Sequence, residues 1–71
     1  MFQATNNWEI ETPTDEMDMV KDCCWYMWDL DVDLIPLDVY NAVVYAHGNV
    51  ITLEQVESIM KALVVLGILK Y

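Results

Sequence analysis

The chain has 71 residues, a hydrophobic fraction of 56 % and a formal net charge of −9. This length leaves room for one domain with a small core, because so short a chain buries only about 60 % of the surface that its unfolded form exposes. Three lysines and no arginine exclude direct binding of nucleic acid, which requires cations to neutralise phosphates. The longest apolar run, Ala62 to Leu69, has eight residues, too few for the ~20 that cross a membrane.

An N-terminal arm, residues 1–11, precedes the first predicted helix. Within it, Trp8–Glu11 alternates apolar and acidic residues, which is typical of either a short strand or an arm docked on the core. The segment Thr12–Asp15 predicts a helix start, with Thr12 as the cap, proline at the first helical position and an acidic residue completing a capping box. We expect a helix over 13–29 with a broad core face. That face comprises Met17, Val20, Cys23, Cys24, Met27 and Trp28.

Residues 29–34 alternate acidic and apolar side chains, which predicts an extended connector, and Pro36 favours an extended residue before it. A helix over 37–47 follows. Its predicted inner face comprises Val39, Tyr40, Val43, Ala46 and His47. Gly48–Asn49 then supplies the left-handed stop that helices favour. The place of His47 at the helix end predicts a structural role beside free backbone carbonyls.

The last helix has the clearest local signals. Thr52–Gln55 forms a second capping box, flanked by Ile51 and Val56 as a hydrophobic staple, and this predicts a helix over 53–66. Its core stripe comprises Val56, Ile59, Met60, Leu63 and Leu66. Gly67 lies in position for a Schellman cap, which lets the next residue fold back on the helix before the chain leaves as a short strand.

Together these elements predict a mainly α fold, a single compact three-helix domain over residues 1–71 with one or two short strands. The stretch from Pro36 to Tyr71 resembles the helix-turn-helix part of winged-helix domains, through a helix ending at Gly48, a capped second helix and the closing sequence Ala62–Leu69. Two departures stand out, because no wing follows the last strand and the helix that would read DNA carries two glutamates. The resemblance implies a winged-helix-like fold without a full wing and without a DNA-binding role.

The negative charge is confined to the first half of the chain. Ten of the twelve acidic residues lie in the range Glu9–Asp38 with Lys21 as the only cation, which gives that half a net charge of −9. Four aspartates of the first helix fall on one stripe opposite its core face, without lysine partners. They are Asp15, Asp18, Asp22 and Asp29. Because like charges three and four residues apart oppose helix formation, we weigh a binding role for the stripe against its simpler interpretation as a solvated face.

The binding interpretation is nucleic-acid mimicry. An extended connector would add Asp31 and Asp33 at spacings of ~6.6 Å, so that carboxylates follow one another like phosphates and are steered toward a basic groove. Trp25 and Tyr26 flank the stripe as contact anchors, unless the N-terminal arm covers them. By size and charge the chain resembles small acidic phage-encoded antagonists of host nucleic-acid machinery, including anti-CRISPR proteins. This resemblance implies a larger, basic nucleic-acid-binding protein as the partner.

The alternative is a structural or assembly subunit. The surplus of apolar residues would then form a homodimer or dock into a larger complex, while the acids keep the chain in solution. Tyr45 and Val65 project away from the inner faces of their helices and suit such a contact.

No catalytic, metal or cofactor signature accompanies these features. Cys23 and Cys24 are adjacent, so they cannot staple distant parts of the fold, and with His47 they lack zinc spacing. The aspartates in 29–33 are similar to the start of a calcium loop, but Leu34 stands where that loop requires glycine. We expect no enzyme activity and no cofactor. Reduced cysteines and the lack of a secretory signal favour the cytoplasm.

Overall fold

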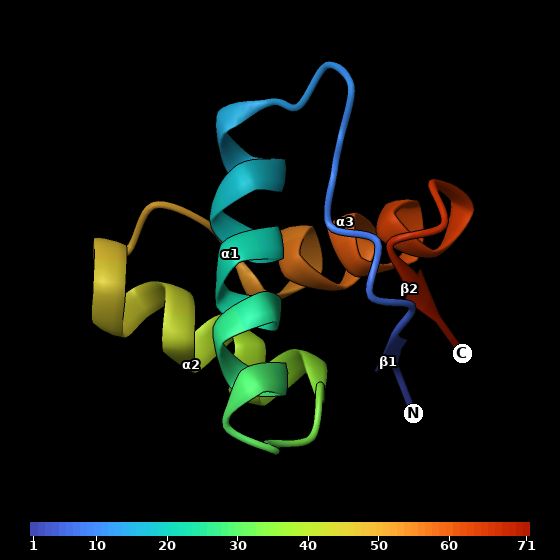
Figure 1. Cartoon of the computed structure of the whole chain (residues 1–71). Coiled ribbons are helices and arrows are strands. Elements are labelled where there is room, and N and C mark those ends of the chain that lie inside the picture. The colour runs from blue at the N-terminus through green and yellow to red at the C-terminus, as the bar shows by residue number, and fades with distance from the viewer.

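The computed structural model describes residues 1–71 as three helices and a two-stranded antiparallel sheet (Figure 1). In chain order the elements are β1 (Gln3–Ala4), α1 (Asp15–Asp29), α2 (Pro36–His47), α3 (Leu53–Val65) and β2 (Leu69–Lys70). Helix α1 packs against both other helices, and the two chain termini lie side by side at the sheet (Figure 1). The predicted mainly α fold with three helices and short strands is confirmed. None of the helices is both long enough and apolar enough to span a bilayer.

The sheet joins the two ends of the chain. β1 pairs with β2, and Thr5 extends this junction because its Oγ1 lies 2.6 Å from the Gly67 carbonyl oxygen and 2.9 Å from that of Ile68. On the other side of β1, Phe2 forms an isolated antiparallel bridge with Leu34. Both Phe2 and Leu34 are buried, so the N-terminal residues belong to the core.

The rest of the N-terminal arm is docked. Trp8–Glu11 forms no strand, and Trp8 and Ile10 are half-buried against the core. In Figure 1 the arm runs from the sheet to the start of α1 as a loop. Of the two interpretations of its alternating pattern, the docked arm is confirmed and the strand at 8–11 is wrong, because β2 is already paired to residues nearer the N-terminus.

Helix α1 begins two residues later than expected. Thr14, not Thr12, is the cap, and its Oγ1 accepts a hydrogen bond from the Met17 N–H at 3.2 Å. Pro13 therefore precedes the cap instead of occupying the first helical position. Capping at Thr14 places three acidic residues in the first turn, where the positive end of the helix dipole favours them.

The connector after α1 begins with a tight reversal, so its predicted extended form is wrong there, whereas Ile35 before Pro36 is extended as predicted. Asp31 has a left-handed backbone with φ of 59°. The Val32 N–H donates to the Met27 carbonyl at 2.8 Å, and the Asp31 N–H donates to that of Trp28 at 3.1 Å. These two bonds are the pair that defines a Schellman motif, with aspartate at the position that glycine usually takes. The motif turns the chain back at once and leads it to the buried Leu34.

The ends of α3 follow the sequence prediction closely. The Gln55 N–H donates to Thr52 Oγ1 at 3.1 Å while the Gln55 side chain accepts from the Thr52 N–H at 2.8 Å, which confirms the capping box. At the other end Gly67 has φ of 78°, and the Ile68 N–H donates to the Leu63 carbonyl at 2.9 Å. The predicted Schellman cap is therefore present. Gly48 ends α2 with φ of 82° and ψ of −167°, a conformation that favours glycine but is not the left-handed helical one that was predicted.

A single core is built from all five elements and the arm. Its buried residues include Val20, Cys23, Cys24 and Met27 of α1, Val39 and Val43 of α2, and Val56, Met60 and Leu63 of α3. Three inner-face predictions are wrong, because Ala46, His47 and Leu66 are exposed. Leu66 lies beyond the last residue of α3, where the reversal turns Ile68 inward in its place. Ala46 and His47 line an open groove at the end of α2 instead of the core.

Candidate protein-binding face

Most aspartates of the predicted stripe reach solvent along α1. Asp15, Asp22 and Asp29 are exposed, and Asp18 is half-buried. We call these four residues the acidic face. Asp15, Asp22 and Asp29 are seven residues apart, so they lie on one side of the helix at intervals of ~10.5 Å along its axis. The structure therefore keeps these predicted site residues together.

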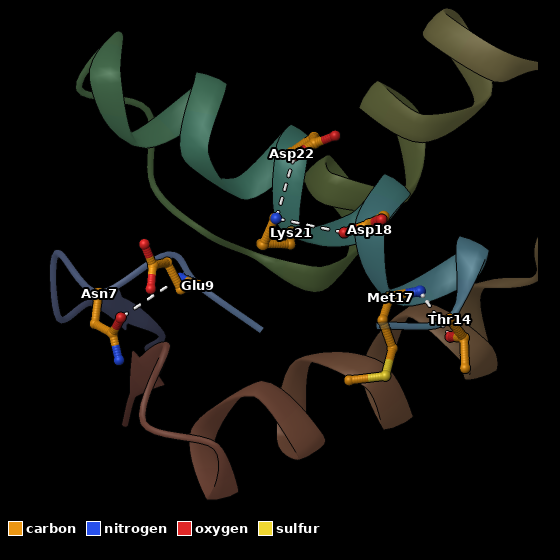
Figure 2. Close-up of polar contacts among 7 residues, drawn as sticks. All are labelled: Asn7, Glu9, Thr14, Met17, Asp18, Lys21 and Asp22. Carbon is orange, nitrogen blue, oxygen red and sulfur yellow. Dashed lines mark hydrogen bonds and ion pairs between the residues drawn. The ribbon is translucent and has the colours of Figure 1, made fainter. Parts of the chain in front are cut away.

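The acidic face has a lysine partner, which corrects the expectation that it has none. Lys21 Nζ lies 3.4 Å from a carboxylate oxygen of Asp18 and 3.8 Å from one of Asp22 (Figure 2). The lysine side chain is half-buried and also lines a hollow beneath the arm with Glu9 and Glu11. Pairs of this kind contribute ~0–1 kcal/mol in water. The face as a whole stays negative, because one lysine neutralises one of four aspartates.

The connector aspartates do not continue the acidic face as a straight row. Asp31 and Asp33 are exposed, but the Schellman reversal separates them from the axis of α1. With Trp28 and Val32 they line a small hollow of about 200 Å³. The predicted phosphate-like spacing of an extended connector is therefore wrong, while the acids themselves stay accessible.

Two aromatic residues stand beside the acidic face. Trp25 is 49 % exposed and Tyr26 is 62 % exposed. The arm leaves them uncovered, because its apolar residues Phe2 and Trp8 are directed into and against the core. Of the two interpretations from the sequence, exposure of these aromatics is the one that the structure supports.

The cysteines and the histidine form no reactive centre. Burial raises the pKa of the Cys24 thiol to about 12, with a smaller effect from Cys23, and burial together with Asp22 raises the pKa of Cys23. Both thiols are thus protonated at neutral pH and pack in the core as predicted. His47 is exposed at the end of α2. No group of three or more histidine, cysteine or acidic residues is placed to hold a metal ion.

Sequence reasoning missed a groove beside the acidic face. A cavity of about 450 Å³ lies between α1 and α2, with Tyr26 on one helix and Tyr45 on the other. The exposed position of Tyr45 was predicted, but its place opposite Tyr26 depends on how the two helices pack.

In comparisons with known proteins, no family model, no curated protein and no solved structure matches this chain.

Proposed function

We propose that this chain is a small, non-enzymatic inhibitor or adaptor of a larger cytoplasmic nucleic-acid-binding protein. Its acidic face, with Trp25 and Tyr26 beside it, would occupy the basic groove in which that protein holds DNA or RNA. One observation carries the proposal: a helix that exposes three aspartates in line also exposes two large aromatic side chains. Negative charge steers association with a basic surface, and aromatic anchors supply the contact once the two surfaces meet.

The spacing of the acidic face is compatible with this role. Successive exposed aspartates rise by ~10.5 Å along α1, and phosphates along one strand of B-DNA rise by ~3.4 Å, so each aspartate step covers about three nucleotides. The mimic proposed here offers separate carboxylates at the positions of some phosphates. The reversal at Asp31 means that it does not offer a continuous row.

Competition for nucleic acid is the proposed mechanism. The partner binds its substrate through cations that neutralise phosphates, and the same cations would bind the acidic face instead. Such binding is tight at low ionic strength and weakens as salt rises, because exposed charges are screened over ~8 Å at physiological ionic strength.

The test is capture from a bacterial lysate on the immobilised chain, with washes at low and then high salt and identification of the released proteins. The proposal expects a nucleic-acid-binding protein that salt releases, and from which the free chain displaces a fluorescent duplex or single strand. Capture that resists salt, or capture of nothing, contradicts the proposal.

A second candidate, an assembly subunit or homodimer, is favoured by a different surface. Val65 is 86 % exposed, Leu66 49 % and Tyr71 84 %, all in the neutral half of the chain. A contact through these residues would lack the salt dependence of the acidic face. Sedimentation of the purified chain at low and high salt distinguishes the two candidates, since only the assembly role expects a stable oligomer at both.

A further inference from the structure

The groove between α1 and α2 is apolar inside and open to solvent. Its buried lining includes Cys23 and Met27 of α1, together with the half-buried Ala42 of α2. Tyr26 and Tyr45 flank it from the two helices, and Tyr45 is 95 % exposed. A cavity of about 450 Å³ falls within the size range of ligand sites, ~300–1,000 Å³.

One acidic residue lines the groove, and three more lie along the same sides of its two helices. Asp22 lines the groove itself, and Asp15 and Asp29 lie on the same side of α1 at seven-residue spacing. On α2, Asp38 precedes Tyr45 by seven residues and so lies on the same side of that helix. All four aspartates are exposed. An occupant of this groove must therefore supply apolar groups to its interior and positive charge to its edges.

We propose that the groove binds an amphipathic, cationic helix of a partner protein. Apolar side chains of that helix would enter between Tyr26 and Tyr45, and lysines or arginines would reach Asp22 and Asp29. Because these two aspartates are ~10.5 Å apart along α1, cations seven residues apart on a helix lying alongside match them. This inference rests on the proposed function, which supplies the basic character of the partner. To that function it adds that the bound segment of the partner is a helix and that it binds in the groove between α1 and α2.

Charge excludes a second copy of the chain as the occupant. Each copy carries a net charge of −9 and three lysines, of which Lys21 already contacts two aspartates. Two acidic rims brought together would repel each other, whereas a cationic helix would neutralise them.

The experiment uses a synthetic peptide of leucine and lysine as the probe, with leucines at helical spacing on one face. Two controls are a shuffled peptide of the same composition and polylysine. Titration of the ¹⁵N-labelled chain is expected to shift amide signals in 22–27 and 42–47, with tight binding only for the amphipathic peptide. Equal binding of the shuffled peptide, or shifts confined to other residues, would overturn the proposal.

A pair of variants locates the contact. Tyr45→Ala is expected to weaken peptide binding at least about five-fold, because it removes an aromatic contact at the groove. Val65→Ala, which changes a similarly exposed residue on α3, should leave the dissociation constant unchanged. Both side chains are almost fully exposed, so both variants are expected to fold. An unchanged dissociation constant in Tyr45→Ala overturns the proposal.

Different experimental outcomes would contradict the groove proposal and the proposed function. If the peptide binds through Tyr45 but the chain captures no nucleic-acid-binding protein, the groove stands and the proposed function is wrong. If a salt-released partner is captured equally well by Tyr45→Ala and the peptide does not bind, the groove proposal is wrong and the acidic face alone carries the function.

Discussion

Helices α1 and α3 share one core but differ in almost everything that faces solvent. α3 has a reciprocal capping box, a glycine at its Schellman end, and glutamates balanced by lysine in the same half of the chain. α1 has a single capping bond, an aspartate as its last residue, and another aspartate in the left-handed position after its end. Local folding signals are therefore strong in α3 and compromised in α1.

The weaker folding signals of α1 involve its surface residues, not its core residues. Val20 and Cys24 are as completely buried as Met60 and Leu63. What α1 adds is acids that continue beyond the first turn as far as Asp29 at the C-terminal end, where the helix dipole does not favour negative charge. The core is therefore equally well formed in both helices, and the exposed acids of α1 are the feature that we propose to contact a partner.

The largest expected effect comes from the core that the two helices share. Leu63→Ala removes a fully buried side chain and should lower the free energy of unfolding by ~2–5 kcal/mol. The neighbouring control Val65→Ala, at an 86 % exposed position, should change it by less than ~0.5 kcal/mol. Urea unfolding followed by circular dichroism measures both. Similar losses in the two variants would mean that α3 buries another face.

A second prediction concerns the α1 side of the core at high pH. The folded state holds the Cys24 thiol protonated up to a pKa of about 12, against 9.0 for the unconstrained thiol. The unfolded chain therefore loses this proton first, and stability falls as pH rises from 9 toward 12, by at most ~1.4 kcal/mol per pH unit. Below pH 9 the contribution is fully present. Under reducing conditions, Cys24→Ala should show a shallower fall across this range than the unmodified chain, and an identical fall would contradict the burial of this thiol.

Substitutions at the two Schellman ends are expected to change the stability of the fold in opposite directions. Gly67→Ala should destabilise by ~1 kcal/mol, because alanine disfavours φ of 78° although its Cβ would meet no other atom within 4 Å. Asp31→Gly should stabilise by ~0.5–1 kcal/mol, because glycine adopts the left-handed backbone without the steric cost of a Cβ atom. Thermal melts of the two variants check this, and a destabilised Asp31→Gly would show that the aspartate side chain has a structural role.

The smallest expected changes in stability come from removing one negative charge at either end of α1. Asp29→Asn removes a negative charge from the C-terminal end of the helix dipole and should stabilise by ~0.3–1 kcal/mol at low salt. Asp15→Asn removes one from the N-terminal end and should destabilise by a similar amount. Both effects should shrink at high salt. If the two variants changed stability in the same direction, general charge repulsion would outweigh the dipole.

Much of the fold could be predicted from the sequence because its signals are local. The capping box at Thr52 and the glycine at position 67 fix both ends of α3, and helical spacing identified the buried face of α1. The start of α1 was predicted two residues too early, because Thr12 and Thr14 are both good caps and the prediction chose Thr12. The end of α1 at Asp29 was predicted correctly, but the Schellman reversal that follows it was missed because Asp31 takes a conformation that is usually assigned to glycine.

The candidate site was predictable only in part, for a physical reason. The positions of Asp22, Trp25 and Tyr26 outside the core face follow from helical spacing, but the sequence left open whether the N-terminal arm covers the two aromatic side chains. The partial neutralisation by Lys21 depends on side-chain geometry, and the groove depends on how α1 and α2 pack. The hydrophobic pattern of one helix predicts which of its own residues are buried, but not where a neighbouring helix lies against it.

A matched pair of charge reversals tests whether the acidic face of α1 binds the proposed partner. Asp22→Lys with Asp29→Lys, and Glu54→Lys with Glu57→Lys, change the net charge equally, from exposed residues of α1 and α3 respectively. The measurement is the amount of salt-releasable protein that each immobilised variant captures from a bacterial lysate. We expect the α1 variant to lose capture while the α3 variant keeps it, and equal losses in both would contradict binding through the acidic face.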